Sequence, residues 1–209
     1  METNQAAENL QVIRTLMERS ALYRRALAPI MLFAGIVGTV AGIANWLVQT
    51  ATVFIMLWAA AAVVAVVGSL LLVRRQAVKD ADAFWSPPTR RIALAMMPSL
   101  VAGLVISVCL FISAGPASGM DILFWLPAIW AILYGSALHA AGFFTPSGVR
   151  VLGWVFLSCG SAILLLALVV DTVALSHWTC RFFMGIVFGG LHLAAGIYLY
   201  FTEQRKNVA

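Results

Sequence analysis

The chain has 209 residues, of which 63% are hydrophobic and only 10% are charged, and its mean hydropathy is +0.98. A soluble domain carries about 25% charged residues, and a water-soluble fold of this length has too much surface to hide so many apolar side chains. The composition therefore excludes an ordinary soluble domain and indicates a membrane protein. The net charge of +5 does not predict nucleic-acid binding, because the basic residues flank apolar runs, where they suit anionic lipid headgroups.

Residues 1–26 predict a cytoplasmic amphipathic helix beside the membrane. Leu10, Ile13 and Met17 recur at a spacing of three to four residues, which puts them on one helical face. Such a helix can lie in the headgroup layer, or it can dock on a partner or on a second copy. The three residues are therefore candidates for interface or partner docking. The segment is not a cleavable signal, because the apolar run that follows it is too long.

Residues 27–202 predict a bundle of six transmembrane helices. Six apolar runs are long enough to cross the hydrocarbon core, at 27–48, 51–73, 92–114, 121–143, 149–170 and 182–202. A helix satisfies its own backbone hydrogen bonds inside lipid, so we expect an all-α polytopic fold. Short outer connections predict antiparallel neighbours arranged as three hairpins, and residues 203–209 form a cytoplasmic tail.

The basic residues predict the orientation of the bundle. Twelve of the thirteen Lys and Arg residues fall on one side of the six spans, and only Arg181 falls on the other. Cytoplasmic loops are enriched in Lys and Arg. Both termini are therefore predicted to be cytoplasmic.

The longest predicted cytoplasmic loop covers residues 74–91 and contains Phe84 and Trp85 before Ser86-Pro87-Pro88. Two prolines stop a helix, and the residue before a proline is pushed towards extended backbone. We expect a structured turn that re-enters the bilayer at Arg90, with the aromatic pair dipping into the membrane interface. The alternative is a cytoplasmic docking surface.

Two blocks of this sequence carry a resemblance. The block ENLQVIR at residues 8–14 with MER at 17–19, and the block FWSPPTRR at 84–91, look like those of an uncharacterised group of bacterial integral membrane proteins. The resemblance implies a bacterial inner membrane. It carries over no activity and no site residues.

Four polar side chains in or near the spans are candidate intramembrane contacts: Asn45, Gln49, His139 and His192. Ionisable groups within a membrane are costly, so each is a functional candidate. In one interpretation the four line a polar path for a proton or a substrate. In the other, each histidine is neutral and makes a hydrogen bond across helices.

Cofactor and enzyme chemistry are not predicted. His139 and His192 would differ in depth by on the order of 8–10 Å at 1.5 Å per residue, which is awkward for one haem between them. The spans contain no paired carboxylates for metal or acid–base chemistry. The sequence also lacks the HExxH, GxSxG and Walker patterns. We expect no metal, no haem and no enzymatic activity.

Glycines mark two candidate packing faces. Gly38 and Gly42, and likewise Gly185 and Gly189, are spaced four residues apart, which lets helix backbones approach closely. These faces could pack within the chain or form a homo-oligomer.

Three classes of function fit the sequence. The first, which we favour, is a non-enzymatic scaffold, regulatory protein or complex subunit with a membrane or cytoplasmic partner. The second is a small transporter or channel that uses the four polar residues above. The third is an intramembrane enzyme or haem protein.

Overall fold

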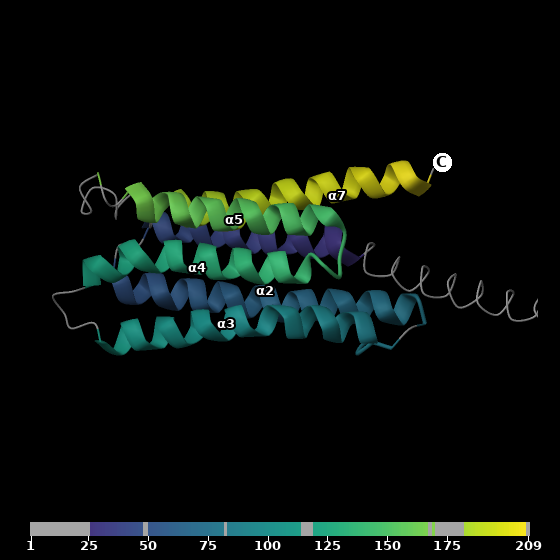
Figure 1. Cartoon of the computed structure of the whole chain (residues 1–209), viewed down its shortest axis with the longest axis horizontal. Helices are drawn as coiled ribbons and strands as arrows, with labels where there is room; N and C mark the ends of the chain where they lie inside the picture. Colours follow the sequence, from purple (N-terminus) through teal and green to yellow (C-terminus); the bar gives the residue numbers. More distant parts are fainter. Residues whose placement is uncertain are drawn as a thin grey trace, which may run out of the picture.

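The structure is a computed structural model, and it describes residues 26–47, 50–81, 83–113, 119–166, 169 and 182–207. Within these ranges every regular element is helical, which confirms the all-α prediction. A first helix covers Ala26–Leu47. It is followed by α2 (Ala51–Lys79), α3 (Pro87–Ser113), α4 (Gly119–Ala141), α5 (Ser147–Leu166), the π-helix η2 (Gly185–Gly190) and α7 (Leu191–Asn207). The helices lie along one long axis as an elongated bundle (Figure 1).

Five helices in the described ranges are long and apolar enough to cross a membrane: Ala26–Leu47, Thr52–Lys79, Pro87–Ile112, Ser147–Leu166 and Gly185–Thr202. Their length and composition support the prediction of a membrane protein. The predicted N-terminal helix, with Leu10, Ile13 and Met17, lies outside the described residues, and so does Gln49.

The two glycine pairs singled out in the sequence pack on each other. A Cβ atom on Gly42 would lie 2.6 Å from the Cα of Gly185, and one on Gly38 would lie 2.9 Å from the backbone nitrogen of Gly189. Gly38 faces Gly189, whereas Gly42, one turn later, faces Gly185, one turn earlier. The first helix therefore runs antiparallel to η2 and α7. The contact lies within one chain, and a homo-oligomer through these glycines would have to separate the two helices.

A second backbone contact joins α4 to α5. A Cβ on Gly135 would lie 2.6 Å from the backbone nitrogen of Leu157, and one on Gly153 would lie 2.5 Å from that of His139. The interface of small residues explains why α5 lies flat against α4 along its length (Figure 1). The sequence analysis did not single out these glycines, although Gly153 and Gly160 recur at a spacing that keeps them on one helical face.

The prolines of the 74–91 segment begin a helix instead of ending one. α2 continues to Lys79 and α3 starts at Pro87, so the helix begins five residues before the apolar run expected at about 92–114. Ser86 directly precedes α3, and its carbonyl accepts the first backbone hydrogen bond of the helix from the Arg90 N–H at 3.0 Å. Its hydroxyl also lies 2.9 Å from that of Thr89. Proline suits the first position of a helix, where its missing N–H has no partner to lose.

The last span is not a uniform α-helix. It contains the π-helix η2, where the Leu191 N–H donates to the Ile186 carbonyl five residues back. π-helical turns are rare, and many lie at functional sites. Here the wide turn directly precedes His192, one of the residues singled out in the sequence.

Burial is very uneven across the bundle. In the membrane-spanning window of the first helix 44% of the residues are buried, whereas the corresponding figure is 6% for both α2 and α3. One core cluster joins Leu27, Met31, Leu138, Leu152 and Phe156. A smaller one joins Ala41, Phe54, Trp58 and Met184. The main core cluster therefore lies among the first helix, α4, α5 and η2–α7. α2 adds Phe54 and Trp58 to the smaller cluster, and few other residues of α2 and α3 are buried.

Candidate functional site

The most organised polar site is centred on His192, at the start of α7. Its Nδ1 atom lies 2.7 Å from the Phe188 carbonyl oxygen, and its Nε2 atom lies 2.8 Å from the Tyr134 hydroxyl. A carbonyl oxygen only accepts, so Nδ1 carries the proton of the neutral ring, and Nε2 accepts from the Tyr134 hydroxyl. Both ring nitrogens are therefore used within the chain.

The π-helical turn sets the position of this ring. In η2 the backbone hydrogen bonds reach the fifth residue back, which widens the turn relative to an α-helix. The His192 side chain bonds to the carbonyl of the residue four positions before it, so it spans the junction between η2 and α7. Nδ1 of His192 thereby bonds to the backbone of the wide turn, and Nε2 bonds to Tyr134 of α4.

Aromatic rings surround the pair. The ring centroid of His192 lies 5.2 Å from that of Phe156 and 5.4 Å from that of Tyr134, and Phe188 lies 5.1 Å from Phe156. His192 is only 3% exposed. We call Tyr134, Phe156, Phe188 and His192 the His192 cluster. Its members come from α4, α5, η2 and α7, so a dry polar contact holds these elements together.

A group of larger rings extends this cluster towards α2 and α3. Trp58 of α2 lies 6.1 Å from Phe188, and Phe54 stacks on Trp130 at 6.0 Å. The Trp130 indole N–H donates to the Ser107 hydroxyl at 2.7 Å, which fastens α3 to α4. In the part of the chain that the structure describes, Trp58 Nε1 is a buried donor without a hydrogen-bond partner. Such an unmet donor costs about 1–3 kcal/mol.

His139 occupies a separate environment near the end of α4. Its ring meets Phe143 and Trp154 edge to face, at centroid distances of 5.3 and 5.1 Å. Nδ1 is buried and has no hydrogen-bond partner among the described residues. An unprotonated Nδ1 tolerates such a site better than an N–H group does, which favours the tautomer with its proton on Nε2.

The structure does not bring the described polar candidates together. Asn45 is 4% exposed and lies two residues before the end of the first helix, whereas His139 lies two residues before the end of α4. Those two helix ends are at opposite ends of the bundle (Figure 1). His192 contacts neither of them in the interactions above. Its nitrogens are already bonded, so an axial bond to a haem iron would require breaking one of these hydrogen bonds.

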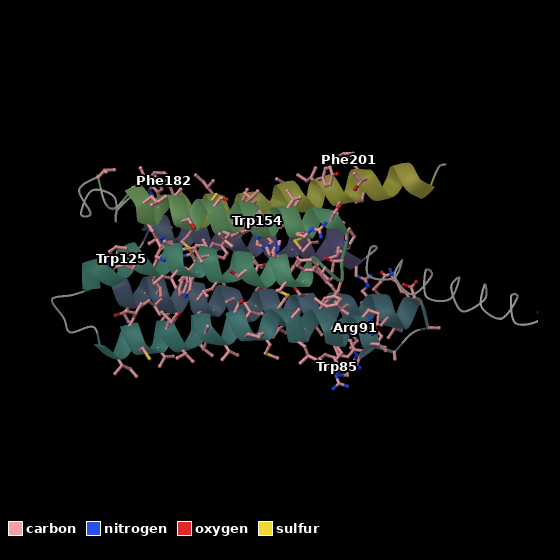
Figure 2. The ribbon with its side chains drawn as sticks, in the orientation of Figure 1. Trp85, Arg91, Trp125, Trp154, Phe182 and Phe201 are labelled. Carbon is pink, nitrogen blue, oxygen red and sulfur yellow. The ribbon has the colours of Figure 1, made fainter. Side chains whose placement is uncertain are left out.

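Phe84 and Trp85 lie between α2 and α3, at the end of the bundle that also carries Arg91 (Figure 2). Both aromatic side chains are exposed, Trp85 to 55%, and their ring centroids are 6.2 Å apart. They are remote from the His192 cluster and form part of a surface.

Comparison with known proteins adds no relative: no family model, no curated protein and no solved structure matches the chain. Among the residues described, no three His, Cys, Asp or Glu side chains gather as a metal site would require.

Sequence analysis singled out His192 but not its partners. Tyr134 is 58 residues away, and nothing local links the two. The one available signal was the spacing of Phe188 and His192, which places them one turn apart on a helix.

Proposed function

We propose that this chain is a non-enzymatic scaffold or regulatory subunit of a protein assembly in a bacterial inner membrane. The resemblance of its 8–19 and 84–91 blocks supports that location. We further propose that α4 supplies a sixth span, that the spans form three hairpins, and that both termini are cytoplasmic. In support, all Lys and Arg residues of the described ranges lie near the same end of the bundle. At that end α2 and α7 finish, and α3 and α5 begin (Figure 1).

The observation that carries the proposal is the scarcity of buried residues in α2 and α3. Only 6% of the residues in the spanning window of each helix are buried. Exposed side chains run along α3, such as Leu104 at 65% and Ile112 at 76%. A helix that is apolar all round is normally buried or lies in lipid. Two consecutive spans with so few buried residues leave apolar surface on which a partner membrane protein can pack.

The burial of His192 and Asn45 favours a scaffold over a transporter. A transport path needs its polar groups on a cavity that water or substrate can enter. His192 has both nitrogens bonded among aromatic rings, and Asn45 is also buried. These two candidates lie in packed surroundings, which weakens the transporter alternative.

Site-specific photo-crosslinking in the native membrane tests the proposal. A crosslinking residue at Leu104 of α3 is expected to capture one protein at constant stoichiometry. The matched control is Val151, which is 60% exposed but lies on α5, and it is expected to capture only lipid. If the position on α3 also captures only lipid, α2 and α3 face the bilayer and the scaffold proposal is wrong.

A further inference from the structure

We infer that the turn between α2 and α3 is a binding surface for the headgroups of anionic phospholipids in the adjoining leaflet. Five exposed cationic side chains gather on the two helix ends that meet there: Arg74, Arg75, Lys79, Arg90 and Arg91. The exposed rings of Phe84 and Trp85 lie on the turn between them. Together they form what we call the basic turn.

Helix length sets the depth of this surface. α2 has 29 residues and α3 has 27, which correspond to about 43 and 40 Å at 1.5 Å per residue. The hydrocarbon core is about 30 Å thick, and the bilayer with its headgroups about 40–45 Å. Both helices are therefore long enough to cross the headgroup layers as well. Their basic ends then lie at the depth of the lipid phosphates.

Hydrogen bonds order the two helix ends that flank the turn. The hydroxyl groups of Ser86 and Thr89 are 2.9 Å apart and buried. On the α2 side, the Gln76 side chain donates to the Asp80 carboxylate at 2.8 Å. Ala81 has a positive φ of 51°, which reverses the chain directly after α2. These contacts leave Phe84, Trp85 and the five cations on the outside.

The composition of the basic turn fits lipid better than a soluble acidic protein. Tryptophan and its aromatic neighbours favour the membrane–water interface, because the ring is apolar while the indole N–H is polar. Basic residues next to a membrane are attracted to anionic headgroups over about one Debye length. Only residues 80–86 separate α2 from α3, so the charges cannot move far from that layer.

Lipid retention by the purified full-length chain tests the inference. The protein is placed in mixed micelles with equimolar phosphatidylglycerol and phosphatidylcholine, and bound lipid is measured by native mass spectrometry. We expect phosphatidylglycerol to be retained at least threefold over phosphatidylcholine. The double variant R90Q/R91Q should lower this preference at least threefold.

The matched control is R205Q/K206Q, which removes the same charge from α7 at the same end of the bundle, and its preference should fall by less than twofold. Equal retention of both lipids by the unaltered chain would overturn the inference. Equal losses in the two double variants would also overturn it, because the effect would then come from overall charge. So would displacement of the lipid by millimolar inorganic phosphate. If R90Q/R91Q does not fold, R74Q/R75Q takes its place under the same criteria.

Discussion

The Tyr134 hydroxyl donates to Nε2 of His192 across 2.8 Å and joins two residues that are 58 positions apart. This bond, with the one from Nδ1 to the Phe188 carbonyl, gives the bundle a specific polar contact between α4 and α7. One imidazole ring therefore links α4, η2 and α7 through its two nitrogen atoms.

Replacing Tyr134 by Phe should destabilise the protein while keeping the ring. The substitution leaves Nε2 of His192 buried without a donor, which costs about 1–3 kcal/mol in proteins generally, whereas hydrogen bonds between membrane helices average about 0.6 kcal/mol. We expect the free energy of unfolding to fall by about 1 kcal/mol, measured by unfolding in mixed SDS micelles. The control is Tyr200→Phe on the exposed surface of α7, which should change stability little. Equal stabilities of Y134F and Y200F would contradict the assigned role of the bond.

Two adjacent glycines in η2 give a sharper test of packing. A Cβ on Gly189 would lie 2.7 Å from the backbone nitrogen of Thr39, whereas a Cβ on Gly190 would have no neighbour within 4 Å. Gly189→Ala should therefore lower the free energy of unfolding by about 1–3 kcal/mol through overpacking. Gly190→Ala should have no cost, or stabilise the helix by up to about 1 kcal/mol. The same unfolding assay measures the stability of both variants. An equal loss of stability in G190A and G189A would show that the contact of Gly189 with the Thr39 backbone does not cause the loss.

The sequence could predict the helices because lipid imposes a simple rule on them. A run such as 51–73 must be helical to satisfy its backbone, and α2 indeed covers it. Gly38, Gly42, Gly185 and Gly189 could be recognised as packing faces from their spacing alone. The sequence could not tell that these two faces meet each other, since that depends on how distant helices are arranged.

Other features had no usable local signal. No residue pattern in the sequence indicated the π-helical hydrogen bonding of η2. Pro87 and Pro88 were expected to stop a helix, but the same residues are well suited to the first turn of one, and α3 begins at Pro87. Tyr134 was not predicted as a site residue, because only the tertiary contact reveals its partner.

The proposed orientation predicts which loops an impermeant thiol reagent can reach. In a chain without its native cysteines, Phe84→Cys should react only after the inner membrane is opened, because the basic turn is cytoplasmic in this orientation. Ala117→Cys, in the connection between α3 and α4, should react in intact spheroplasts. The opposite pattern would overturn the proposed orientation, and reaction of both positions in intact spheroplasts would contradict a single orientation.

A double-mutant cycle would isolate the energy of the Tyr134–His192 contact. His192→Phe keeps a ring of similar size but leaves the Phe188 carbonyl without its side-chain donor, so we expect it to cost about 2–3 kcal/mol, more than Y134F. In the double variant Y134F/H192F neither partner remains, so the Tyr134 change should add little to the H192F cost. Contacting residues typically show coupling of about 0.5–3 kcal/mol, and we expect about 1 kcal/mol here. Strictly additive losses would mean that the two side chains act independently and that the hydrogen bond contributes no coupling energy.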